Sequence, residues 1–105
     1  RENTFLFEPF FPTVSHLKII LDQHRIKEAY LFGSVVGENF KESSDIDLLI
    51  KFDVTPFEGY AENLWDLEDK LEMLFQRKVD VIPDHTLKNP FFINEVEKTK
   101  VKIYG

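Results

Sequence analysis

The chain has 105 residues, of which 43% are hydrophobic, and it carries a formal net charge of −6. This length is typical of one domain with a single core and one functional cleft. An acidic chain without a clustered basic patch argues against a direct nucleic-acid partner, because phosphate backbones are bound mainly by Lys and Arg. The absence of cysteine excludes disulfides and thiolate metal sites, and no apolar run is long enough to cross a membrane. The composition therefore predicts a cytoplasmic protein that has no membrane partner.

The first twelve residues, RENTFLFEPFFP, contain four phenylalanines and two prolines. Because proline interrupts a regular helix, we expect residues 1–12 to form an extended, phenylalanine-rich N-terminal arm. Two roles stay open for this arm: packing on the surface of its own domain, or docking a partner through exposed aromatic side chains. Residues 13–105 are then expected to form a single domain.

The domain is expected to begin with a helix and two strands. Apolar residues recur at helical spacing between about Thr13 and His24, which predicts the helix. The short apolar segment EAYLF, residues 28–32, predicts the first strand. The segment DIDLLIKF, residues 45–52, is the clearest strand pattern, because every second residue from Ile46 onward is apolar. One face of this strand should therefore enter the core.

A long helix is expected after these strands. In TPFE, residues 55–58, the threonine can cap a helix, the proline suits its first turn, and the glutamate completes a capping box. The helical period then continues to about Gln76. Trp65 and Met73 lie beside the apolar stripe and are assigned to the core. The acidic residues on the other side are interpreted as a solvated face, and they are Glu62, Asp66, Glu68, Asp69 and Glu72.

The last part of the chain predicts a strand, a helix and a strand. RKVDVI, residues 77–82, alternates as a strand does. Asn89 followed by Pro90 is typical of a helix cap and first turn, so a short helix is expected through about Lys98. VKIY, residues 101–104, is expected to form an edge strand. The whole pattern predicts an α/β (α+β) fold, with helices packed on a small mixed β-sheet.

Three aspartates occupy strand positions that can bring their side chains together. Asp45 and Asp47 are separated by one residue, so both project from the same side of a strand. Asp80 lies within a later strand, and it joins them if the two strands are neighbours. Clustered carboxylates repel one another. Mg²⁺ would offset this repulsion, because it prefers oxygen ligands and typically binds one or two carboxylates together with substrate phosphates. The cluster therefore predicts a magnesium site, and two ions can share such carboxylates.

Gly33 and Ser34 follow the first strand directly. Glycine lets the backbone turn tightly and approach a ligand closely, and the following N–H groups and the serine hydroxyl can hold phosphate oxygens. A Gly-Ser pair alone has little specificity. The combination of strand, Gly-Ser, ten residues, Asp-x-Asp and a later strand aspartate predicts a site for a metal and a nucleotide.

The segment GSVVGENFKESSDID resembles the nucleotidyltransferase superfamily related to DNA polymerase β. The small size, KVDVI and the closing KNPFFINEVEKTKVKIYG resemble its minimal nucleotidyltransferases, from about residue 13 to the C-terminus. The resemblance implies a polymerase β-like nucleotidyltransferase fold, ATP as substrate and two Mg²⁺ ions. By that likeness Asp45, Asp47 and Asp80 are the catalytic and metal-binding residues. Asp80 would act as a metal ligand or take the acceptor's proton, and Gly33 and Ser34 would bind the triphosphate.

The phosphate-binding loop departs from the pattern of that family. Its commonest version reads Gly-Ser, two residues, then Arg-Gly, whereas Gly37 and Glu38 occupy the last two positions here. A basic residue expected near the phosphates is therefore missing, which bears on nucleotide affinity and on the choice of base. Lys41 is the nearest candidate to compensate for it.

Minimal nucleotidyltransferases resemble the antitoxin halves of systems whose toxins carry a helical HEPN ribonuclease domain. The likeness thus implies a HEPN-type toxin as partner and a side-chain hydroxyl of that toxin, such as a tyrosine, as the AMP acceptor. The alternative is a non-catalytic antitoxin that neutralises its partner by complex formation. The three intact aspartates favour chemistry, while the altered loop and the aromatic arm keep the binding alternative open.

Other chemistries fit the sequence less well. In haloacid-dehalogenase-like phosphatases the Asp-x-Asp pair follows an apolar strand, whereas here it precedes one. A calcium loop would need more oxygen ligands in one continuous run. Histidine catalysis is not expected, because His16, His24 and His85 have no cysteine or hydrolase serine motif beside them, and they are assigned to the surface or to helix ends.

Overall fold

The computed structural model describes residues 14–33, 45–54 and 57–105. The elements follow the predicted order, with one additional short 3₁₀ turn after the third strand. They are α1 (Val14–Gln23), β1 (Ile26–Phe32), β2 (Ile46–Phe52), α2 (Tyr60–Phe75), β3 (Val79–Pro83), η3 (Asp84–Thr86), α3 (Pro90–Thr99) and β4 (Val101–Tyr104).

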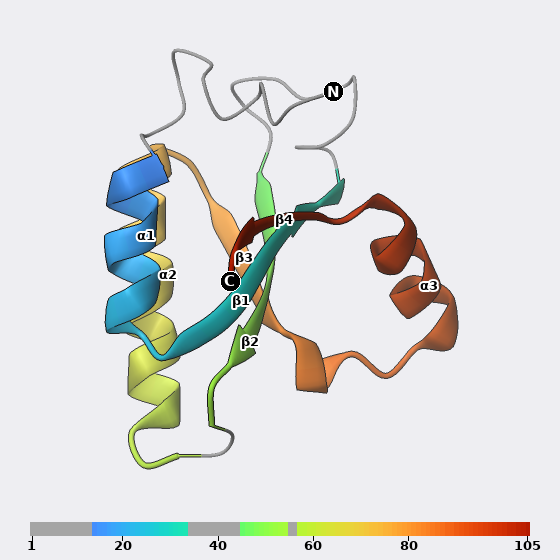
Figure 1. Cartoon of the computed structure of the whole chain (residues 1–105), viewed down its shortest axis with the longest axis horizontal. Coiled ribbons are helices and arrows are strands. Elements are labelled where there is room, and N and C mark those ends of the chain that lie inside the picture. The colour runs from blue at the N-terminus through green and yellow to red at the C-terminus, as the bar shows by residue number, and fades with distance from the viewer. Residues whose placement is uncertain (1–13, 34–44, 55–56) are drawn as a thin grey trace.

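The four strands form one mixed sheet in the order β3-β2-β1-β4. β1 pairs antiparallel with β2 and with β4, whereas β2 pairs parallel with β3. Helices α1 and α2 lie together on one side of this sheet and α3 lies on the other (Figure 1). The predicted mixed sheet is confirmed, and so is the edge position of the last strand.

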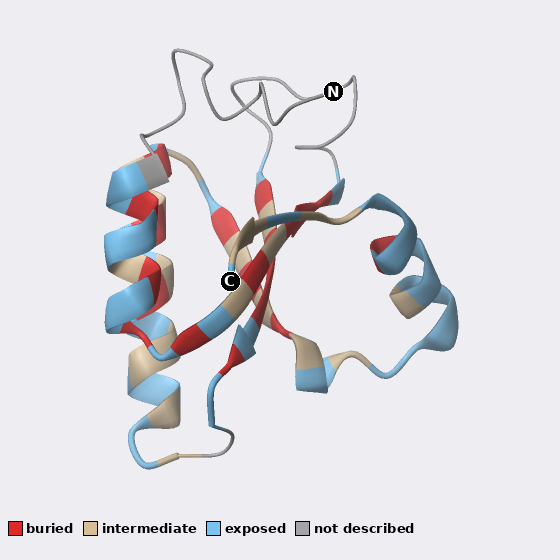
Figure 2. Ribbon diagram, viewed as in Figure 1, coloured by how far each residue is buried: buried red, intermediate tan, exposed pale blue. Residues whose placement is uncertain are grey.

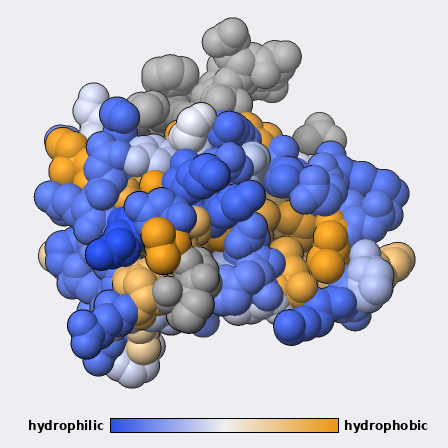
Figure 3. Space-filling model, turned by 60° about the horizontal axis from the view of Figure 1, so that its bottom comes forward, coloured by the Kyte–Doolittle hydropathy of each residue, from blue (hydrophilic) through white to orange (hydrophobic). Residues whose placement is uncertain are grey.

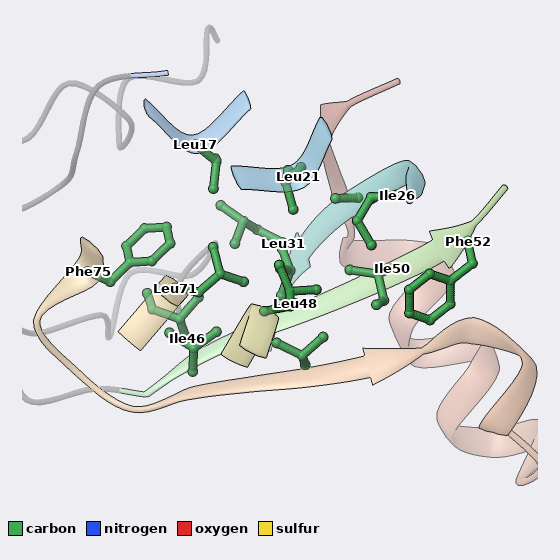
Figure 4. Packing of buried hydrophobic residues seen from close by; sticks show 14 residues of the cluster. Leu17, Leu21, Ile26, Leu31, Ile46, Leu48, Ile50, Phe52, Leu71 and Phe75 are labelled. Carbon is green, nitrogen blue, oxygen red and sulfur yellow. The ribbon is translucent and has the colours of Figure 1, made fainter. Parts of the chain in front are cut away.

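The larger core fills the space between the sheet and the α1–α2 pair. The alternating apolar residues of β2 all enter it, because they point to one face of the strand. Leu17 and Leu21 of α1 and Leu71 and Phe75 of α2 pack against them (Figure 4). Buried positions accordingly line the inner faces of α1 and α2 and occur along β1, β2 and β3 (Figure 2). The outer faces of both helices remain exposed.

A smaller core lies on the opposite face of the sheet. Phe32 of β1, Leu49 of β2 and Val96 of α3 are its buried members. Asn89 fixes the start of α3, since its side chain accepts hydrogen bonds from the backbone N–H groups of Phe91 and Phe92, at 2.9 and 3.3 Å. The predicted Asn-Pro helix start is therefore confirmed. This second core matters for function because the odd-numbered positions of β2 face it.

Helix α2 begins later than predicted. Its N-cap is Gly59, in the left-handed conformation at φ 79°, with no side-chain cap hydrogen bond, and the first helical residue is Tyr60. Phe57 packs its ring against Phe52 and Tyr60, at centroid distances of 5.5 and 5.4 Å. This aromatic packing holds Phe57 in a turn outside the helix, so tertiary contacts override the local capping pattern; residues 55 and 56 lie outside the described part.

Two residues assigned to the core are on the surface. Trp65 is 63% exposed and Met73 is 73% exposed. The buried residues of α2 are Leu67, Leu71 and Phe75, which form a narrower stripe than the apolar pattern implies. A helix that covers one face of a sheet buries only one stripe, and both side chains fall outside it.

The prediction for His24 is also wrong in part. It follows the end of α1 as expected, but only 4% of the residue is exposed. Its Nδ1 lies 2.7 Å from the Ile20 carbonyl oxygen and its Nε2 lies 2.7 Å from Asp66 Oδ2 of α2. His24 therefore joins α1 to α2, and Asp66 belongs to this contact and not only to a solvated face. Within the described residues, no helix has both the length and the apolar character needed to cross a membrane.

Candidate active site

The candidate site lies where β2 and β3 run side by side. Their parallel register pairs Asp47 directly with Asp80. Neighbouring strands are about 4.8 Å apart, and directly paired residues project from the same face of a sheet. The condition that the sequence left open, that the two strands be neighbours, is thus met.

The end of β1 approaches the same point from the other side of β2. Phe32 is the register partner of Asp47, and Gly33 follows it at a φ of 76°. A Cβ atom built on Gly33 would lie 2.5 Å from Asp47 Oδ2. The glycine backbone is therefore in close contact with the Asp47 carboxylate, and only a residue without a side chain leaves that carboxylate in place.

The electrostatic environment of Asp47 opposes its ionisation. Asp47 is half-buried, and burial is the largest cause that raises the pKa of its carboxyl group, followed by the negative charges of Asp80 and Asp45. Asp45 immediately precedes β2 and is exposed. Asp80 and Asp45 are therefore both close enough to Asp47 to influence its ionisation.

Lys78 is a charged neighbour of this group that the sequence reading missed. Its Nζ lies 3.6 Å from Asp80 Oδ1, and both side chains are substantially exposed. An exposed pair of this kind contributes little to stability. The alternation of a strand could have revealed it, because residues two apart project from one face.

The site matches a divalent cation in donor type, although not as a preassembled cage. Among the described residues, no three acidic, histidine or cysteine side chains lie close enough together to form a ready metal site. The donors present are carboxylate oxygens, the ligands that Mg²⁺ prefers. The raised pKa of Asp47 reflects negative charge that a cation would compensate. The residues therefore fit magnesium chemistry in which the substrate completes the coordination.

Several predicted features fall outside the described residues. They are the N-terminal arm, Ser34, the altered loop positions Gly37 and Glu38, and Lys41. Of the predicted phosphate-binding pair, the structure thus places Gly33 alone.

Apolar surface and a small cavity lie on the α3 side of the sheet, and none of the three aspartates lines the cavity. The Phe92 ring packs edge-on against Phe32 at 6.0 Å between centroids, and Phe91 beside it is 75% exposed. A cavity of about 260 Å³ includes Leu49, two residues beyond Asp47 on the same strand face, in its lining. On the face that Figure 3 shows, apolar side chains gather in patches among hydrophilic ones. The sheet face from which Asp47 projects is therefore also the face on which α3 and its exposed Phe91 lie.

Residues 15–105 match the family model described as "Polymerase beta, Nucleotidyltransferase". The chain belongs to this family. The family assignment confirms the resemblance seen in the Gly-Ser and Asp-x-Asp pattern, and it makes the protein a nucleotidyltransferase.

Curated relatives of this nucleotidyltransferase carry a more specific name. Protein adenylyltransferase MntA of Thermococcus cleftensis is 32% identical over 75 residues, which cover 71% of this chain and 73% of the relative. A Methanocaldococcus jannaschii protein with the provisional name protein adenylyltransferase is 32% identical over 88 residues, covering 84% of this chain and 87% of that protein. The similarity to both relatives therefore extends over most of this chain.

Solved structures confirm the fold. A chain of a toxin–antitoxin complex with AMP-PNP superposes with a TM-score of 0.69 at 20% identity, covering 88% of this chain and 73% of that one. A structure described as a minimal nucleotidyltransferase superposes with a TM-score of 0.68 at 24% identity. The match covers 84% of this chain and 86% of that one. A chain from the structure of a tri-AMPylated HEPN toxin of Shewanella oneidensis in complex with MNT antitoxin superposes with a TM-score of 0.62 at 19% identity. The match covers 88% of this chain and 69% of that one. The predicted minimal nucleotidyltransferase fold is thus confirmed.

Proposed function

We propose that this nucleotidyltransferase transfers AMP from ATP to a side-chain hydroxyl of a HEPN-type toxin and thereby acts as its antitoxin. The observation that carries the proposal is the direct pairing of Asp47 with Asp80, with Gly33 packed against Asp47. The names of the relatives support AMP transfer to a protein. The likeness to an antitoxin that is bound to an AMPylated HEPN toxin supports the class of acceptor.

Asp45, Asp47 and Asp80 are the residues that would hold magnesium. When bound there, Mg²⁺ supplies positive charge that offsets both the carboxylates and the phosphate oxygens of the nucleotide. The half-buried position of Asp47 orients one carboxylate by packing against Gly33. The exposed side chain of Asp45 would be accessible to a nucleotide.

The reaction is a displacement at the α-phosphorus of ATP. The acceptor oxygen forms a bond to that phosphorus, and the bond from the phosphorus to the bridging oxygen breaks. Pyrophosphate leaves with the electron pair, and the proton of the hydroxyl passes to a carboxylate, for which Asp80 is the candidate. Such a transfer depends mostly on positioning and on charge stabilisation, and both are served by rigid strands that carry the carboxylates.

Gly33 and Ser34 would bind the triphosphate at the end of β1. The left-handed conformation of Gly33 turns the chain away from the strand beside Asp47. Backbone N–H groups in such a turn can point towards an anion. The turn would thus place the phosphates next to the carboxylates.

The test is the intact mass of a co-encoded HEPN-type protein after incubation with this chain, ATP and magnesium. A gain in whole AMP units is expected, and EDTA should prevent it. The matched control is the double variant Asp45→Asn, Asp47→Asn, which changes charge with almost no change of shape and should transfer no AMP.

An unchanged mass would contradict the proposal. If the two proteins co-purify and the toxin is silent without any mass change, the chain acts as an antitoxin that only binds. If they neither associate nor react, the acceptor belongs to another class of molecule.

A further inference from the structure

The outer edge of β3 is covered by two glutamates of α2. β3 is an edge strand of the sheet, so alternate backbone N–H groups point away from β2 and need other partners. The Val79 N–H donates to Glu72 Oε2 at 3.1 Å. The Val81 N–H faces the Glu68 carboxylate closely enough to work to lower the pKa of Glu68. The next outward position is Pro83, which has no N–H group.

The spacing of the two elements makes this double contact possible. Residues four apart on a helix lie on the same side and are separated by about 6 Å along its axis. Residues two apart on a strand are separated by about 6.6 Å. Glu72 contacts Val79 and Glu68 contacts Val81, so the helix runs opposite to the strand and the two repeats match.

Asp80 lies between the two clamped residues. Its own backbone faces β2, because the Lys78 carbonyl two residues earlier accepts a hydrogen bond from the Ile46 N–H at 3.0 Å. β3 is thus held by β2 on its inner edge, at Asp80. It is held by α2 on its outer edge, at Val79 and Val81. This double attachment fixes the register that pairs Asp80 with Asp47.

Glu68 is placed where its charge opposes a carboxylate of the site, that of Asp80. Burial is the largest cause that raises the pKa of Glu68, and the charges of Glu72 and Asp80 add to it. A half-buried acidic residue beside another carboxylate is unfavourable unless it makes a contact that offsets the repulsion. The Val81 N–H that faces the Glu68 carboxylate supplies such a contact, and a solvated helix face does not require it.

We propose that Glu68 and Glu72 are positioning residues that hold Asp80 in register with Asp47 through the backbone of Val79 and Val81. This inference rests on the proposed function, because it assigns Asp80 a role in metal binding and transfer. It predicts that the hydrogen-bond acceptor matters and that the negative charge does not. Glutamine, which keeps an acceptor oxygen, should therefore replace either glutamate.

The experiment compares Glu68→Ala and Glu72→Ala with Glu68→Gln and Glu72→Gln in the full chain. Three quantities are measured: amide hydrogen exchange at Val79 and Val81, Mn²⁺ affinity by electron paramagnetic resonance, and kcat and KM for AMP transfer. Asp69→Ala is the matched control, because it removes a carboxylate from the same helix and makes no hydrogen bond to β3 within the described residues.

In each alanine variant, the amide that faces the substituted position should exchange its hydrogen at least about tenfold faster. Mn²⁺ should bind about tenfold more weakly, which is the loss of affinity seen when a residue that supports a metal ligand is removed. The value of kcat should fall by a similar factor, with a smaller change in the KM for ATP. The glutamine variants and Asp69→Ala should stay within about threefold of wild type.

Alanine variants with wild-type Mn²⁺ affinity and kcat would overturn the inference, even if their amides exchange faster, because the glutamates would then only protect the strand edge. Glutamine variants as weak as the alanine variants would overturn it too, by showing that charge is what matters. If an alanine variant fails to fold, the glutamine variant at the same position is used in its place. A change of more than about threefold in its Mn²⁺ affinity or kcat would overturn the inference. A wild-type chain that neither binds Mn²⁺ nor transfers AMP would instead refute the proposed function, and this inference with it.

Discussion

Asp47 and Asp80 occupy directly paired positions of the parallel strands β2 and β3. Both carboxylates therefore project from one face of the sheet, and Asp80 makes an exposed ion pair with Lys78 at 3.6 Å. Burial and the nearby charges of Asp80 and Asp45 raise the pKa of Asp47. The fold thus brings negative charges together at a point where the sheet itself gains nothing from them, which is typical of a functional site.

Asp47→Asn should stabilise the metal-free protein at neutral pH. The pKa of Asp47 is raised from its ordinary value of 3.8, so folding favours the protonated form. The stability that this preference gives is fully present below pH 3.8 and is lost as the pH rises through the higher folded-state value. The melting temperature of the variant, measured in EDTA between pH 3 and 8, should exceed that of wild type by a few degrees at pH 7 and converge with it at low pH. A variant that melts below wild type at pH 7 would count against charge repulsion at this site.

Magnesium should stabilise the wild-type chain and not the double variant Asp45→Asn, Asp47→Asn. A ligand that binds only the folded state adds about 1.4 kcal/mol when its free concentration is ten times Kd. Melting curves with magnesium and with EDTA measure the difference, and calcium serves as a comparison for a larger cation. Equal shifts in both proteins would place the bound ion elsewhere.

Gly33→Ala should abolish most transfer while leaving the domain folded. The new Cβ would lie 2.5 Å from Asp47 Oδ2, so the carboxylate must move, and the left-handed φ of 76° adds strain of about 1 kcal/mol. The expected result is a loss of at least about tenfold in kcat with a small loss of stability. Gly59→Ala is the control, because Gly59 is also left-handed but has open space around it. Normal transfer by Gly33→Ala would show that the Asp47 carboxylate adapts.

The order of the elements and the orientation of β2 could be predicted from the sequence because they depend on local patterns. The apolar residue at every second position of β2 indicates which face enters the larger core, and therefore to which side Asp47 projects. An Asn-Pro pair starts α3 through contacts within three residues. These features need no knowledge of what packs against them.

The remaining features depend on partners that are distant in the sequence. Helix α2 begins at Tyr60 because the aromatic packing of Phe57 against β2 outweighs a capping pattern. His24 is buried because Asp66, 42 residues later, approaches its ring. Glu72 looks like one more acidic residue on a polar helix face until β3 is known to be an edge strand. The pairing of Asp47 with Asp80 was conditional for the same reason, since the sequence does not state the strand order.

Trp65→Ala and Met73→Ala should change the free energy of unfolding by less than about 0.5 kcal/mol, because both side chains are mostly exposed. Leu67→Ala and Leu71→Ala on the same helix are the matched controls, and each should lose about 2–5 kcal/mol. Urea denaturation of the four variants measures these differences. A loss of more than 2 kcal/mol at Trp65 would place its ring in a contact that the described residues do not contain.

His24→Ala should be among the most destabilising substitutions outside the two cores. Both ring nitrogens lie 2.7 Å from an acceptor, the Ile20 carbonyl at the end of α1 and the Asp66 carboxylate on α2. Its removal leaves a partly buried carbonyl without its partner and a gap between the helices, so a loss of about 2–4 kcal/mol is expected. Asp66→Asn keeps an acceptor oxygen at an exposed position and should lose less than about 1 kcal/mol. Equal losses in the two variants would mean that the charge of Asp66 holds the helices together, whereas a negligible loss for His24→Ala would mean that water replaces the ring at no cost.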